Sequence, residues 1–156
     1  MVDANTRTPG LREIVGGDAV EDCLVFSDLL TPEIAQPALP RPSPQSNLLL
    51  VPSGNITCHP SQVFDPAKFG NFMESVTRTF DFVVFDSSPI GKYYDSIVLA
   101  SHLDGVVLVT QAEKTPLREL RIAKQQFQDR DIRILGVVLN RRRFHIPQFI
   151  FQRFFG

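Results

Sequence analysis

Several features that would assign a function class directly are missing from this sequence. Its two cysteines, Cys23 and Cys58, stand far apart and outside any CxxC or metal-ligand spacing, which argues against a disulfide framework or a zinc site. The net charge is −1, so there is no basic excess of the kind that marks a nucleic-acid partner. No apolar run reaches the roughly 18–20 residues that span a bilayer, and no signal peptide opens the chain. A reducing cytoplasm is the expected location.

A phosphate cradle is missing as well. Phosphate-binding loops use GxxxxGK[ST], whose backbone N–H groups and lysine hold the phosphates, and no such motif occurs here. Gly91-Lys92 is no substitute, because the earlier glycine is absent and Tyr93 follows. The three histidines are scattered without ligand spacing. These sequence features therefore predict neither a complete nucleotide site nor a histidine-based metal site.

What is present predicts an α/β fold. The 156 residues are 43% hydrophobic, enough for one domain with a real core. Short apolar runs, typical of strands buried on both faces of a parallel sheet, occur at residues 47–51, 82–85, 105–109 and 134–139. Helical patterns alternate with them. We therefore expect a three-layer, doubly wound, mostly parallel sheet with helices on both faces.

Three helices are predicted between these runs. The first begins at Asp65-Pro66, where aspartate caps and proline takes the first helical position. A second is expected from about Asp95 to His102, and a third from Thr115-Pro116 to about residue 129. The apolar faces predicted for the first and third comprise Phe69, Phe72, Met73 and Val76, and Leu117, Leu120, Ala123 and Phe127.

Polar residues follow directly on several apolar runs. They are Asp3, Asp86, the pair Thr110-Gln111, and Asn140. Because parallel strands end at one edge of a sheet, we expect these side chains to meet in one crevice. Taken alone, Asp86 has two interpretations: a Walker B aspartate that holds Mg²⁺, or a strand-end residue that caps a loop.

The order of these motifs resembles a known family. MVDANTRTPGL is similar to a Walker A′ segment, FDFVVFDSSPI to a Walker B strand, and ILGVVLNRRR to the closing strand, in the bacterial tyrosine kinases of capsular and exopolysaccharide loci. These kinases, of the CpsD/CapB type, belong to the P-loop class that includes MinD and ParA ATPases. The resemblance extends to about residue 143 and implies an incomplete P-loop NTPase fold that begins at Walker A′.

The resemblance implies roles for five residues and two cofactors, Mg²⁺ and ATP. Asp3 would bind metal and activate the acceptor hydroxyl, while Asp86 would hold Mg²⁺ through water. Arg7 would belong to the catalytic Walker A′ group, and Asn140 would lie near the nucleotide base. Asn5 stands where the motif has a second acid, so it would contribute to cofactor binding without neutralising a cation.

Two departures from the family bear on activity. The family's P-loop lies just upstream of Walker A′, and only Met1 and Val2 precede Asp3, so we expect weak nucleotide binding by this chain alone. The family also ends in a tyrosine cluster, whereas residues 144–156 are rich in phenylalanine and contain no tyrosine. We therefore divide the chain into a partial kinase-like domain, 1–143, and a Phe-rich tail, 144–156.

Three functions remain open at this point. The first is a polysaccharide-locus tyrosine autokinase that is inactive in this form, and the second is a non-catalytic regulator of export. In both, the implied partner is the cytoplasmic tail of a membrane chain-length regulator, with no nucleic acid involved, and homo-oligomers are compatible with the family. The third is a ParA/MinD-like ATPase. Arg141–Arg143 with the tail fit either peripheral docking at the inner membrane or an ordinary solvated surface.

Overall fold

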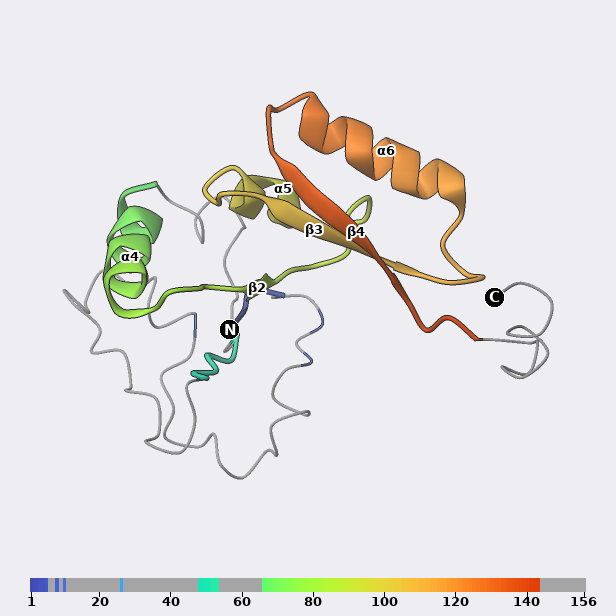
Figure 1. Cartoon of the computed structure of the whole chain (residues 1–156). Helices are drawn as coiled ribbons and strands as arrows, with labels where there is room; N and C mark the ends of the chain where they lie inside the picture. The colour runs from blue at the N-terminus through green and yellow to red at the C-terminus, as the bar shows by residue number, and fades with distance from the viewer. Residues whose placement is uncertain (6–7, 9, 11–25, 27–47, 54–65, 144–156) are drawn as a thin grey trace. The chain divides into compact units, whose positions relative to one another are not determined.

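The computed structural model describes residues 1–5, 8, 10, 26, 48–53 and 66–143 (Figure 1). Arg7, Asn47 and the tail 144–156 lie outside the described residues. The chain divides into two compact units, Met1–Leu99 and Ala100–Gly156. Each unit is described by itself below.

The first unit is organised around two very short parallel strands. Strand β1 (Val2–Asp3) pairs with β2 (Phe85–Asp86) in a register that sets Asp3 opposite Asp86. Val51 forms an isolated parallel bridge with Val2, and the Asp3 N–H donates to the Val51 carbonyl over 2.8 Å. Within the predicted strand at residues 47–51, the described part therefore contributes one bridge rather than a full strand.

Helix α4 (Pro66–Thr79) supplies the core of this unit. The helix begins at the predicted Pro66, while Asp65 lies outside the described residues; Phe69, Phe72 and Val76 of the predicted stripe are 1%, 2% and 3% exposed, and Met73 is only half-buried. The Phe72 ring packs edge-on against Phe26 and Phe85, with ring centroids 5.8 and 6.2 Å apart. Each aromatic pair of this kind adds about 0.5–1.5 kcal/mol beyond the area buried. An aromatic cluster thus ties α4 to β2.

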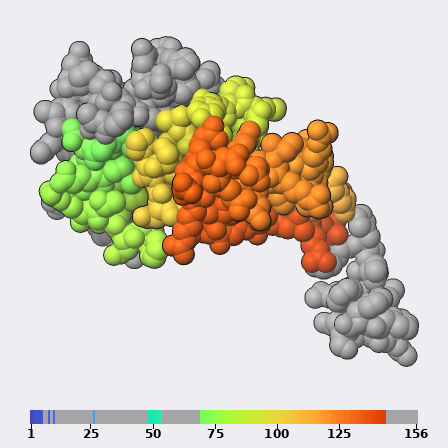
Figure 2. Space-filling view, turned by 90° about the horizontal axis from the view of Figure 1, so that it is seen from above, coloured from blue at the N-terminus to red at the C-terminus, as the bar shows by residue number. Residues whose placement is uncertain are grey.

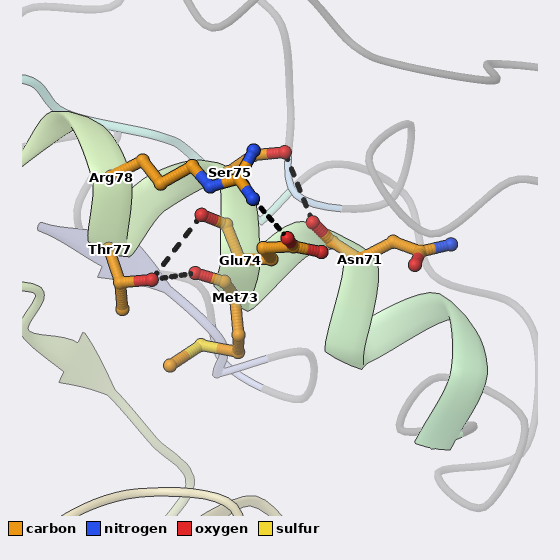
Figure 3. A network of polar contacts seen from close by, with 6 residues as sticks. All are labelled: Asn71, Met73, Glu74, Ser75, Thr77 and Arg78. Atoms are coloured by element: carbon orange, nitrogen blue, oxygen red, sulfur yellow. Dashed lines mark hydrogen bonds and ion pairs between the residues drawn. The ribbon is translucent and has the colours of Figure 1, made fainter.

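The opposite face of α4 is occupied by contacts within the helix (Figure 3). The Thr77 hydroxyl donates to the Met73 carbonyl over 2.8 Å, and Arg78 pairs with Glu74 at 2.6 Å. An exposed ion pair at this spacing contributes only about 0.3–0.5 kcal/mol. We interpret this face as a solvated surface. Helix α5 (Asp95–Ala100) then begins in the same unit and ends two residues before the predicted His102.

The second unit contains a longer parallel pair. Strand β3 (Val106–Gln111) and β4 (Ile134–Asn140) are connected through α6 (Leu117–Gln128), and their register ends with Gln111 opposite Asn140 (Figure 1). Gly105 lies where the strands approach closely: a Cβ there would stand 2.9 Å from the Arg133 carbonyl oxygen. This close approach requires glycine.

Helix α6 matches its predicted span closely but not all of its predicted face. Ala123 and Phe127 are buried at 6% and 3%, whereas Leu117 is 61% exposed because it opens the first turn, beyond the packed part of the helix. The helix ends at Asp129, whose N–H donates to the Gln125 carbonyl over 2.9 Å. The predicted stop near residue 129 is confirmed.

The prediction that the strands are buried on both faces is wrong for the runs at residues 82–85, 105–109 and 134–139, none of whose residues is buried, while Val51 in the run at 47–51 is 3% exposed. Phe82 is 89% exposed, and the regular β2 covers only the end of the predicted run. In β4 the consecutive residues Val137 and Val138 point to opposite faces and are 53% and 48% exposed. In the described part the sheet of the second unit has only β3 and β4, so each has an unpaired edge there, whereas β1 in the first unit lies between β2 and the Val51 bridge. Figure 2 shows atoms of the β3 and β4 region at the molecular surface.

Candidate functional site

Two carboxylates meet at the ends of β1 and β2. The Asp3 side chain is fully buried, whereas Asp86 is exposed. Burial raises the pKa of the Asp86 carboxyl, the negative charge of Asp3 raises it further, and a backbone hydrogen bond from Ser87 partly offsets both. The two groups therefore interact electrostatically, as paired acids do at sites that bind cations or move protons.

The backbone around Asp3 fixes this geometry. The Ala4 N–H donates to the Asp86 carbonyl over 2.8 Å, so the two strand ends stay joined one residue past the acids. The Asp3 Oδ1 atom accepts the Asn5 N–H over 3.0 Å, which turns the chain at the end of the strand. An aspartate can end a strand in this way because its short side chain reaches the backbone two residues on. The Asp3 carboxylate is thus held in one place.

Asn5 lies at the centre of a second network. Its Oδ1 atom accepts the Thr8 N–H over 3.1 Å and the Ser88 hydroxyl over 3.0 Å. Its amide nitrogen donates to the Thr8 hydroxyl oxygen over 3.1 Å. With these contacts Asn5 connects the segment after β1 to the turn after β2, and its direct role toward a cofactor stays a prediction.

Ser88 is a site residue that the sequence motifs did not single out. It is 3% exposed and is the β2-side donor of the Asn5 network. Its position two residues after a strand-end aspartate was the available signal. That signal is weak, because serine is common in any turn.

The second unit holds the other predicted site residues that the structure describes. Gln111 pairs with Asn140 at the ends of β3 and β4, and the Ala112 N–H donates to the Asn140 carbonyl over 2.9 Å. Thr110 is buried and donates its hydroxyl hydrogen to the Val138 carbonyl over 3.3 Å. The structure thus brings Asp3, Asn5 and Asp86 together in one unit and Gln111 with Asn140 in the other; a single crevice stays a prediction.

The donor set in the first unit suits a hard divalent cation. Among the described residues there is no group of three or more His, Cys, Asp or Glu side chains that could hold a metal. Two carboxylates fit Mg²⁺, which uses one or two carboxylates and keeps several waters. A cation would also counter the charge that raises the pKa of Asp86. Separately, none of the described helices is long and apolar enough to cross a membrane.

Comparison with known proteins identifies the relatives of the chain. No family model matches it. Over 94 residues it is 35% identical to the tyrosine-protein kinase CpsD of Streptococcus agalactiae, across 60% of this chain and 41% of that protein. Over 140 residues it is 24% identical to the tyrosine-protein kinase wzc of Salmonella typhi, across 90% of this chain and 19% of that protein. Its homologues are bacterial tyrosine kinases.

The solved structures agree on the fold. The VpsO kinase domain superposes with a TM-score of 0.73 at 23% identity, over 91% of this chain and 69% of that domain. The expected α/β fold with parallel strands is therefore confirmed as a tyrosine-kinase-type P-loop NTPase fold. The chain spans less than half the length of these two kinase relatives. The family resemblance expected from the motifs is confirmed.

Proposed function

We propose that this is a protein of capsular or exopolysaccharide biosynthesis, built on the tyrosine-kinase fold, in which Asp3 and Asp86 form the acidic part of an Mg²⁺–ATP site. The observation that carries the proposal is the parallel register of β1 and β2, which sets the two carboxylates opposite each other. The raised pKa of Asp86, caused first by burial and then by the charge of Asp3, supports it, because a bound cation would offset the repulsion between the two carboxylates. The kinase homologues support the choice of ATP.

Each site residue has a distinct proposed role. Asp86, which is exposed, would hold Mg²⁺ through water, and buried Asp3 would take part in metal binding and in activating an acceptor hydroxyl. Arg7 belongs to the catalytic group, Asn140 lies near the nucleotide base, and Asn5 holds the Asp3 segment against Ser88. When bound, Mg²⁺ would balance charge on the phosphates.

The isolated 156-residue polypeptide is expected to bind nucleotide weakly. It contains no GxxxxGK[ST] sequence, so the phosphates lack their usual N–H donors and lysine. We propose a cytoplasmic location with peripheral attachment at the inner membrane. The proposed partner is the cytoplasmic tail of a membrane chain-length regulator, and self-association is compatible with this arrangement.

A second candidate is a non-catalytic regulator on the same fold. The contacts of Asn5 favour it: an amide stands where the resembled motif has an acid, and its oxygen already accepts hydrogen bonds from Thr8 and Ser88. An amide cannot neutralise a cation, so metal affinity falls. In this case the fold would serve to contact the membrane partner.

Calorimetric titration with Mg²⁺–ATP tests the site. We expect a dissociation constant weaker than about 1 mM, with the measured binding lost in Asp86→Ala and kept in Asp81→Ala, a matched change at an exposed aspartate of the same segment. Sub-millimolar binding that depends on Asp86 would overturn the expected weakness. Equal binding by wild type and Asp86→Ala would overturn the metal site and favour the regulator.

A further inference from the structure

The chain has two tyrosines, and both lie in the turn between β2 and α5. Tyr93 and Tyr94 are adjacent, in the same unit as Asp3 and Asp86. Tyr93 is 38% exposed and Tyr94 is 57% exposed, while the next residue, Asp95, falls to 5%. The turn therefore presents two phenol rings at the surface, immediately before the chain becomes buried.

The backbone of this turn is anchored at both ends. Ile90 forms a parallel bridge with Tyr93 across a tight turn, in which Gly91 takes a positive φ of 90° that other residues rarely adopt. On the other side, the Tyr94 carbonyl accepts the N–H groups of Ile97 and Val98 over 3.1 and 3.2 Å. The Tyr94 backbone is thus part of the first turn of α5.

We propose that Tyr94 is a phosphorylation site. The inference rests on the proposed function for the class of enzyme, a tyrosine kinase of the homologous type, but not on this chain being the catalyst. The Tyr94 oxygen attacks the γ-phosphorus of ATP and forms a new P–O bond. The bond to the β-phosphate oxygen breaks, ADP leaves with that electron pair, and the phenolic proton passes to a base or to water.

Exposure and anchoring explain the choice of Tyr94 over Tyr93. A phosphate adds a charge of about −1.5 to −2, which is costly to bury and tolerated where water hydrates it. Tyr94 has the larger exposed fraction, and its hydrogen-bonded backbone stays fixed when the ring is modified. Tyr93 is less exposed and its backbone makes the bridge that closes the turn.

Labelling by an added kinase tests the inference. The full chain is incubated with Mg²⁺–ATP and purified CpsD of Streptococcus agalactiae, in a preparation that first phosphorylates a synthetic tyrosine peptide. Intact mass and fragment spectra then count and locate the phosphates. We expect one phosphate on Tyr94, a loss of at least about fivefold in Tyr94→Phe, and near wild-type labelling in Tyr93→Phe. Circular dichroism confirms that both variants fold.

The outcomes separate this inference from the proposed function. An unlabelled wild-type chain beside a labelled peptide overturns it, and so does Tyr94→Phe labelled as strongly as wild type. Labelling of Tyr94 supports it even if the Mg²⁺–ATP titration finds no Asp86-dependent binding, because the kinase is supplied. Conversely, Asp86-dependent ATP binding without labelling of Tyr94 leaves the proposed function standing and removes the acceptor site.

Discussion

The Ser88 hydroxyl donates a hydrogen bond to the Asn5 side-chain oxygen over 3.0 Å, joining residues that lie 83 positions apart in the chain. Both partners are buried. The bond holds the segment after β1 against the turn after β2, and the two carboxylates stand at the ends of the same strands. Two uncharged residues, Asn5 and Ser88, thus help to hold the strand ends that carry Asp3 and Asp86.

Replacing Ser88 with alanine should weaken this connection. Asn5 loses one donor in a buried setting, so we expect a loss of about 0.5–1.5 kcal/mol in the free energy of unfolding, measured by urea denaturation. Ser75→Ala is the control, because that hydroxyl donates to a helix carbonyl at an exposed position. A Ser88→Ala variant as stable as the control would show that the Asn5 network is not stabilising.

The raised pKa of Asp86 predicts a specific pH dependence. In the folded state Asp86 holds its proton to higher pH than in the unfolded state, so its contribution to stability falls as pH rises from the ordinary aspartate value, about 3.9, through the raised one. At a pH above both the unfolded and the folded pKa, Asp86 is ionised in both states, and its unfavourable effect on the free energy of unfolding is fully present. Asp86→Asn should therefore raise the urea midpoint at pH 7.

The same comparison at low pH provides the check. Below both pKa values the wild-type carboxyl is neutral in either state, so the gain from Asp86→Asn should shrink toward zero. Asp81→Asn is the control, since it changes an exposed aspartate of the same segment. An equal gain at both pH values would mean that charge is not the cause.

The aromatic cluster allows a matched pair of truncations. Phe72 is 2% exposed and packs against Phe26 and Phe85, whereas Phe82 is 89% exposed. Phe72→Ala should lower the free energy of unfolding by about 3–5 kcal/mol, through lost burial and the cavity left behind. Phe82→Ala should change it by less than about 0.5 kcal/mol. Similar losses in thermal or urea unfolding would contradict the packing of α4.

Two glycines predict effects of opposite sign. At Gly105 a Cβ would lie 2.8 Å from the Leu135 Cγ atom and 2.9 Å from a backbone oxygen, so Gly105→Ala should destabilise by about 1–3 kcal/mol. At Gly70, within α4, a Cβ meets nothing within 4 Å. Gly70→Ala should therefore stabilise by about 0.5–1 kcal/mol through helix propensity. In urea unfolding, the midpoint of Gly105→Ala should lie below that of wild type and the midpoint of Gly70→Ala above it.

Local sequence signals predicted some elements well. The Asp-Pro start and the i, i+3, i+4, i+7 spacing located α4 and three of its four predicted core residues, because a helix face depends on nearby residues; Met73, at i+4, is only half-buried. The strand ends that carry Asp3 and Asp86 lie side by side, as expected of parallel strands, while the predicted crevice shared with Gln111 and Asn140 stays a prediction. These inferences needed only periodicity and the geometry of a sheet edge.

The burial of side chains and the contacts between residues far apart in the sequence were harder to predict. A run such as FDFVVF is equally apolar whether or not all of it joins a strand, so its composition does not show that Phe82 lies outside β2 and is exposed. The bond from Ser88 to Asn5 carries no local pattern, because its partners are distant in the chain. Hydrogen bonds between distant residues can be identified only once the tertiary structure is known.

The half-exposed valines and leucines of β3 and β4 have a practical consequence for anyone handling the isolated polypeptide. Apolar side chains on both faces of a two-stranded pair, with strand edges unpaired in the described residues, form a surface that other molecules of the same kind can cover. Concentrated samples should therefore self-associate, and sulfate or phosphate salts should promote this by strengthening apolar contacts. Self-association of the folded polypeptide, rather than its unfolding, should then limit the concentration that a sample can reach.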